Sequence, residues 1–117
     1  FKYGTATFNA QTIGSDDNLT VTVPVSNVGS RDGEEVVQVY LNKVGDEEGP
    51  VKTLKAFKRV LVPAGKTANV RITLSKKDLE WWNETTHSIQ FCPGKYQVWI
   101  GGSSDEKDLS KYAITLK

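Results

Sequence analysis

The stretch Glu34-Glu35-Val36-Val37-Gln38-Val39-Tyr40-Leu41 decides the fold, because its pattern is that of a central β-strand used on both faces. Side chains two residues apart lie on the same face of a strand, and one such set is entirely apolar: Val37, Val39 and Leu41. The opposite set is half apolar: Val36, Gln38 and Tyr40. A face exposed only to water would be more polar. We therefore expect the first face to meet the domain's own core and the second to meet something outside the domain.

Short β-prone segments separated by turn signals surround this stretch. Leu19 to Ser26 and Thr67 to Leu74 alternate cleanly between apolar and polar residues, as half-buried antiparallel strands do. Residues 5–8 suit an edge strand or a lead-in from a preceding domain, and the other predicted strands are 54–62, 88–91, 96–100 and 112–116. About seven strands without a long helix predict an all-β, immunoglobulin-like antiparallel β-sandwich.

Three local features refine this prediction. Pro24 cannot donate a hydrogen bond to a neighbouring strand, which suggests an edge or a bulge there. The segment 54–62 carries the charges that discourage pairing at a sheet edge: Lys55, Lys58 and Arg59. Ser75 and Asp78 resemble a capping box, so residues 76–82 are predicted to form a helical turn or two, and residues 43–50 a surface loop.

The composition limits the partners of this chain. It has 117 residues and a formal net charge of +1, which indicates one domain without a global field for nucleic acid or anionic membranes. There is no apolar run near the length of a membrane span. The single cysteine excludes an internal disulfide, and the chain does not begin with Met. We expect a monomeric domain cut from a longer protein.

No residue pattern predicts catalysis, a metal or a cofactor. His87 and Cys92 are an odd number of residues apart across a predicted strand, so their side chains should point to opposite faces. One histidine and one cysteine do not make a zinc site. The acidic clusters at 46–48 and 105–108 do not have the spacing of a calcium loop. No two acids are placed on converging strands as glycoside cleavage requires.

The tryptophans are the best candidates for binding. Trp81 and Trp82 could stack on sugar rings, which would make the chain an independent carbohydrate-binding or adhesion module with an oligosaccharide partner. The alternative is that one of the two belongs to the sandwich core. Tyr96, two residues after Pro93-Gly94, suits a tyrosine corner that pins one end of a sandwich.

A family resemblance extends over nearly the whole chain. The ordered motifs are Gly33 to Tyr40, Val51 to Val60, Pro63-Ala64-Gly65-Lys66, Asp78 to Asn83, Pro93 to Val98 and Ile100 to Ser104. Together they resemble the fibronectin type III-like domain that closes many family 3 glycoside hydrolases. Phe1-Lys2-Tyr3-Gly4 is similar to the junction before that domain, with Lys2 as a departure. Residues 1–14 would then be junction and first strand from the preceding domain, and 15–117 the sandwich.

The resemblance implies a non-catalytic C-terminal module of a retaining β-glucosidase or β-xylosidase. In that family the nucleophilic Asp and the acid/base Glu lie in upstream domains, so no catalytic residue transfers to this chain. The Glu80-Trp81-Trp82-Asn83 version of its motif favours a bacterial, xylosidase-like subgroup. We expect the parent to be periplasmic or secreted, a compartment that this chain does not itself determine. We expect Val36, Tyr40 and Trp99 to form the docking surface for the parent's catalytic domains.

Overall fold

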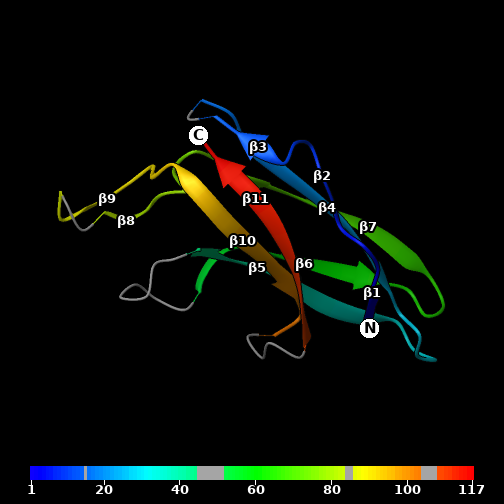
Figure 1. Cartoon of the computed structure of the whole chain (residues 1–117). Helices are drawn as coiled ribbons and strands as arrows, with labels where there is room; N and C mark the ends of the chain where they lie inside the picture. Colours follow the sequence, from blue (N-terminus) through cyan, green and yellow to red (C-terminus); the bar gives the residue numbers. More distant parts are fainter. Residues whose placement is uncertain (15, 45–51, 84–85, 104–107) are drawn as a thin grey trace.

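A computed structural model describes residues 1–14, 16–44, 52–83, 86–103 and 108–117, with only the backbone of Trp82 and Asn83. Two sheets lie face to face, as Figure 1 shows, and the termini lie at opposite ends of the molecule. In the first sheet β4 (Leu19–Ser26) pairs with β7 (Thr67–Leu74) on one side and with β1 (Lys2–Tyr3) and β2 (Thr7–Phe8) on the other. The predicted all-β sandwich is confirmed.

The second sheet has five strands. Their order is β3 (Thr12–Ile13), β11 (Leu109–Leu116), β10 (Gly94–Gly101), β5 (Gly33–Lys43) and β6 (Thr53–Val62). β5 pairs with β10 and β6, so it is internal as predicted, and β6 lies at the edge, as its lysines and arginine indicated. One pairing departs from the antiparallel prediction, because β3 runs parallel to β11. A separate hairpin joins β8 (Trp81–Asn83) to β9 (Ser88–Gln90).

The core lies between the inner faces of the two sheets. Alternation along β4 buries Leu19, Val21, Val23 and Val25, and alternation along β5 buries Val37, Val39 and Leu41. The chain's first residues contribute too, since Ala6 and Ile13 are buried in the same cluster. Ala6 and Ile13 therefore contribute to the sandwich core, and the boundary expected between residues 14 and 15 stays a prediction.

Pro24 lies inside the paired strand β4, at a point where the pairing on one side is interrupted. It stands opposite Asn69 of β7, while its carbonyl faces the other side and accepts a hydrogen bond from the Gly4 amide at 2.8 Å. Gly4 falls between β1 and β2, where the pairing along β4 is interrupted. The missing amide hydrogen therefore points to a gap between two short strands, which meets the constraint that proline imposes on a sheet.

The helical turn or two predicted over 76–82 forms only in the first part of that segment. Ser75 and Asp78 do make the expected contacts, with the Ser75 amide and hydroxyl 2.9 and 3.0 Å from the Asp78 carboxylate, but the chain forms a turn only over 76–79. Leu79 and Trp81 are both buried, and residues two apart share a face only in extended chain. Burial of this pair therefore favours strand β8 over continued helix. No helix in the described part of the chain is long and apolar enough to cross a bilayer.

Candidate docking face

The side of the five-stranded sheet that faces away from the core is called here the outer face. Residues directly opposite each other on antiparallel strands share a face, so the register identifies its members. Tyr40 of β5 stands opposite Leu54 of β6 and Trp99 of β10. Further along, Gln38 is opposite Phe57, Val36 is opposite Arg59, and Glu34 is opposite Leu61. The predicted docking residues Val36, Tyr40 and Trp99 thus share one continuous surface.

Trp99 and Tyr40 form a partly covered, basic centre on this face. The Trp99 indole donates a hydrogen bond to the Asn42 side-chain oxygen at 2.5 Å. The Lys52 and Lys111 ammonium groups lie 5.8 and 5.3 Å from the Trp99 ring centroid, within cation–π range. Lys52 also lies over Tyr40, which is only 9% exposed. Val36 and Trp99 are half-buried, so Tyr40 is the most covered of the three. The surface loop predicted at 43–50 lies mostly outside the described residues.

The most exposed apolar side chains of the outer face are on β6, where the sequence had suggested only guarding charges. Leu54, Phe57 and Leu61 are 45%, 67% and 63% exposed. A bulge explains why the sequence spacing did not predict that these three side chains share a face. Val39 pairs with Ala56 and Tyr40 with Leu54, so Lys55 is an extra residue in β6. The bulge brings Leu54 onto the same face as Phe57 and Leu61. A strict period of two assigns Leu54 to the other face.

The Lys55 side chain extends from the bulge toward Glu80 and Trp81. Its ammonium donates a hydrogen bond to the Glu80 carbonyl at 2.7 Å and lies 5.5 Å from the Trp81 ring centroid. Burial is the main influence on this ammonium and lowers its pKa, against the opposing charges of Asp78 and Glu80. The bulge therefore links the edge strand to the turn that precedes β8.

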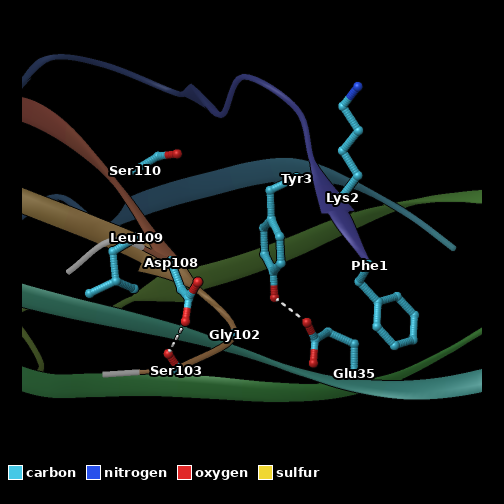
Figure 2. Close-up of a pocket in the computed structure, with 9 residues that line it drawn as sticks. All are labelled: Phe1, Lys2, Tyr3, Glu35, Gly102, Ser103, Asp108, Leu109 and Ser110. Atoms are coloured by element: carbon cyan, nitrogen blue, oxygen red, sulfur yellow. Dashed lines mark hydrogen bonds between the residues drawn. The ribbon is translucent and has the colours of Figure 1, made fainter. Parts of the chain in front are cut away.

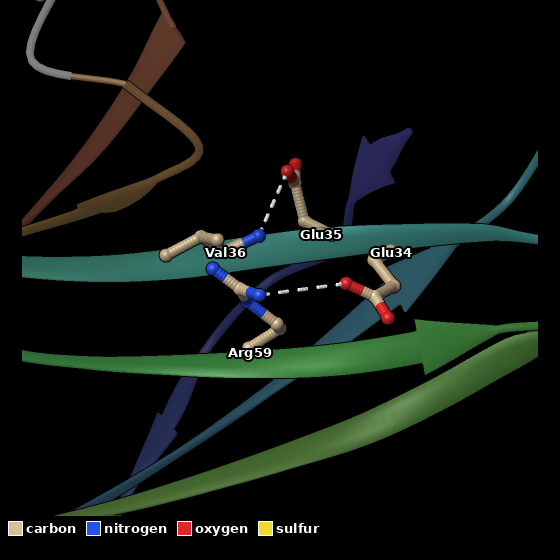
Figure 3. A network of polar contacts seen from close by, with 4 residues as sticks. All are labelled: Glu34, Glu35, Val36 and Arg59. Carbon is tan, nitrogen blue, oxygen red and sulfur yellow. Dashed lines mark hydrogen bonds and ion pairs between the residues drawn. The ribbon is translucent and has the colours of Figure 1, made fainter.

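Figure 3 shows the polar groups that border the apolar residues of the outer face. Arg59 and Glu34 form an ion pair at 3.8 Å, with side chains 71% and 60% exposed. A pair this open contributes little to stability. Its guanidinium and carboxylate are available to a partner that lies on the same face.

A hollow of about 470 Å³ lies where the first strand meets the ends of β5, β10 and β11 (Figure 2). The Tyr3 hydroxyl points into it and donates a hydrogen bond to Glu35 at 3.0 Å, and Ser103 donates one to Asp108 at 3.0 Å. The other Glu35 oxygen accepts from the Val36 amide at 3.1 Å. Burial, followed by the Glu35 charge and hydrogen bond, raises the pKa of Tyr3. Both acids in the hollow are thus hydrogen-bonded within the chain.

Two glycines follow one another at this end of β10, where the chain comes close to Asp108 and Glu35. A Cβ on Gly102 would lie 2.6 Å from a Glu35 carboxylate oxygen, and one on Gly101 would lie 2.2 Å from the Asp108 carbonyl oxygen. The Gly101 contact is with backbone and leaves no room for a side chain, whereas the Gly102 contact is with the far end of the Glu35 side chain, which can move. Gly101, expected only as part of a connector, therefore permits the close approach of β10 to the start of β11.

Tyr96 has the geometry that the tyrosine-corner prediction requires. Its side chain is fully buried, and its hydroxyl donates a hydrogen bond to the Cys92 carbonyl, four residues upstream, at 2.5 Å. Trp81 packs against it, with ring centroids 6.1 Å apart and planes at 82°. These aromatic groups close the end of the sandwich opposite to the Tyr3 hollow.

The structure contradicts the sugar-stacking prediction for Trp81. Its side chain is only 3% exposed. The indole packs against the Tyr96 ring in an edge-to-face arrangement, and the Lys55 ammonium lies over the indole ring. A buried indole has no open face for a sugar ring. The Trp82 side chain lies outside the described residues, so its part of that prediction stays untested.

The described residues do not assemble a metal or thiol centre. Within them, no group of three or more His, Cys, Asp or Glu side chains is arranged to hold a metal ion. Cys92 is buried, and its thiol is 3.4 and 3.6 Å from the carbonyls of Gln90 and Trp81, while His87 is exposed in a turn. The predicted acidic clusters at 46–48 and 105–107 lie outside the described residues. Asp108, at the edge of the second cluster, is hydrogen-bonded to Ser103.

This geometry defines a class of protein: an immunoglobulin-like β-sandwich whose notable surface is a partly apolar sheet face. The fibronectin type III-like domain model matches residues 35–104. The chain belongs to the fibronectin type III-like domain family.

Individual relatives match more of the chain. It is 41% identical over 116 residues to a xylan 1,4-β-xylosidase of Xylanibacter ruminicola, which covers 99% of this chain and 13% of that protein. It is 45% identical over 95 residues to a probable β-glucosidase M of Aspergillus niger, covering 81% of this chain and 12% of that one. A solved β-glucosidase from Erythrobacter marinus superposes on 99% of this chain with a TM-score of 0.85 and 29% identity, over 15% of its own length. The chain spans less than a sixth of each of these proteins.

Proposed function

We propose that this chain is a non-catalytic module of a longer family 3 glycoside hydrolase, where it packs against the catalytic domains and stabilises them. The parent cleaves β-glucosidic or β-xylosidic ends with retention, and its nucleophile and acid/base residues lie outside these 117 residues. The module sits at the C-terminal end of the parent. Its docking surface includes Val36, Tyr40 and Trp99.

One observation carries this proposal. Nearly the whole chain, 99%, aligns at 41% identity with a stretch that makes up only 13% of a xylosidase. Similar stretches occur in a probable fungal β-glucosidase and in a solved bacterial one. A part of that size, with a closed core of its own, fits the role of an accessory domain.

The local chemistry supports a non-catalytic role. A two-carboxylate mechanism needs one acid to donate a proton and a second to attack or activate water across the scissile bond. Glu35 accepts hydrogen bonds from Tyr3 and from the Val36 amide, and Asp108 accepts one from Ser103. Both carboxylates thus serve as hydrogen-bond acceptors within the chain, at the hollow beside Tyr3.

The experiment compares two proteins: the product of the intact reading frame and the isolated 117-residue chain. Both are assayed with nitrophenyl β-glucoside and nitrophenyl β-xyloside. We expect turnover by the intact product and none above buffer by the isolated chain. Turnover by the isolated chain that is lost when one of its own acids is mutated would contradict the proposal, as would an intact product without activity on either substrate.

A further inference from the structure

We propose that Leu54, Phe57 and Leu61 form an apolar row on β6 that seats the part of the parent chain preceding Phe1. The inference rests on the proposed function, because it needs a longer parent. It moves the centre of the docking surface from Tyr40 and Trp99 to the sheet edge.

The exposure of the row is the first step. Each of the three side chains is at least 45% exposed, and the register together with the bulge at Lys55 places all three on the outer face. Among the described residues, the other exposed large apolar side chains are dispersed over the N-terminus, loops and hairpin: Phe1, Val28, Val44 and Ile89. Leu54 and Phe57 are neighbours on that face, and Arg59 stands between Phe57 and Leu61. Exposed apolar side chains gathered on one face are typical of interaction sites, whereas residues scattered singly need no explanation.

The shape of the edge adds a second step. Leu54 and Phe57, with Lys55, Ala56 and Asp78, line a hollow of about 340 Å³ beside the row. Half-buried Val36 and Trp99 continue the apolar surface toward the middle of the sheet. A partner segment could place a side chain in the hollow and extend across β5.

The position of the N-terminus points to the occupant. The Phe1 ring lies against Gly33, where an added Cβ would be 3.1 Å from it, and Gly33 pairs with Val62, the residue after Leu61. Figure 1 shows the N-terminus close to the tip of β6 and the C-terminus at the far end of the molecule. Relatives contain several times more chain than the part matched here. Chain that precedes Phe1 therefore enters at the Leu61 end of the row.

The charges on β6 disfavour a second copy as the occupant. Lys55, Lys58 and Arg59 lie within five consecutive residues of the edge strand. Antiparallel pairing of β6 with itself would bring these positive groups close to their own copies, which is destabilising. A different segment of the parent does not carry that penalty.

The test is hydroxyl-radical footprinting of the isolated chain and of the intact parent, read by mass spectrometry at each residue. We expect labelling of Leu54, Phe57 and Leu61 to fall several-fold in the parent. Ile89, 60% exposed on the β8–β9 hairpin, is the matched internal control and should be labelled equally in both. Equal labelling of the row in both proteins overturns the inference. Labelling that already falls in the isolated chain as its concentration rises also overturns it, because a second copy is then the occupant.

Substitution gives a second readout that does not depend on activity. Phe57→Ser and Leu61→Ser should lower the melting temperature of the parent by several degrees more than Ile89→Ser, while all three leave the isolated chain folded. Equal shifts for all three variants in the parent would contradict docking at the row. The activity assay on the parent is independent: an inactive parent with a protected row refutes the proposed function alone, and an active parent with a labelled row refutes this inference alone.

Discussion

The Tyr3 hydroxyl donates a hydrogen bond to Glu35 at 3.0 Å and thereby joins the two sheets, since Tyr3 belongs to β1 and Glu35 to β5. The contact fixes the first strand beside the central strand, close to where Phe1 lies against Gly33. It therefore sets the direction from which preceding chain would enter the sandwich.

Tyr3→Phe should lower the free energy of unfolding by about 0.5–1.5 kcal/mol at neutral pH, the usual net contribution of one hydrogen bond. The variant should also change the pH dependence. The pKa of Tyr3 is raised in the folded chain from its ordinary value of 10.0, so its stabilising effect is present below pH 10 and is lost as the pH rises further. Denaturant unfolding between pH 8 and 11 should show a smaller alkaline loss for Tyr3→Phe than for the wild type. Identical pH profiles would contradict the role assigned to this hydroxyl.

Val39→Ala should cost about 1–4 kcal/mol, because Val39 is fully buried and the substitution leaves a cavity. Val36→Ala is the matched control on the same strand, since Val36 points to the outer face and is only half-buried. Ile72→Ala, on the opposite sheet, should behave like Val39→Ala. Urea unfolding of the isolated chain measures all three, and equal losses for Val36 and Val39 would refute the assignment of inner and outer faces.

Tyr96→Phe should cost about 1–3 kcal/mol, because it removes the buried hydrogen bond to the Cys92 carbonyl and leaves that acceptor without the hydroxyl. Tyr40→Phe provides the comparison, since the Tyr40 hydroxyl bonds to the Gln38 side chain on the partly exposed outer face. In thermal unfolding, the melting temperature of Tyr96→Phe should lie well below that of Tyr40→Phe. The reverse order would exclude a pinning role for Tyr96.

Trp99→Ser should destabilise the isolated chain by only about 1 kcal/mol, the net value of its partly buried hydrogen bond to Asn42. If the outer face docks on the catalytic domains, the same substitution should lower the melting temperature of the intact parent clearly more. Calorimetry on both proteins makes the comparison. A substitution that unfolds the isolated chain would place Trp99 in the core instead.

The sequence allowed the sandwich to be predicted because alternation with a period of two is enforced by burial on one face. Val21, Val23 and Val25 could not exchange faces without exposing the core. Charged Lys58 and Arg59 likewise indicated an edge strand. These are local signals, and each is readable without knowledge of the neighbouring strand.

The candidate docking face was harder to predict, because its shape depends on a bulge. The extra residue Lys55 shifts the phase of β6, and only the partner strand reveals the shift. Trp81 was misassigned for a related reason: the Ser75–Asp78 contacts form as in a capping box, but burial of Leu79 and Trp81 determines that the chain leaves the turn as a strand. Tertiary burial outweighed the local helix signal at the end of this segment, where β8 begins.

The measurement that tests the account most directly is calorimetric unfolding of the intact parent beside a parent from which residues 1–117 of this chain have been deleted. If the module docks on the catalytic domains and stabilises them, the deletion should lower the melting temperature of the remaining catalytic part, and the full parent should unfold with this module coupled to that transition. A catalytic part that melts at the same temperature with and without the module, and keeps its full kcat/KM on the nitrophenyl glycosides, would contradict the account.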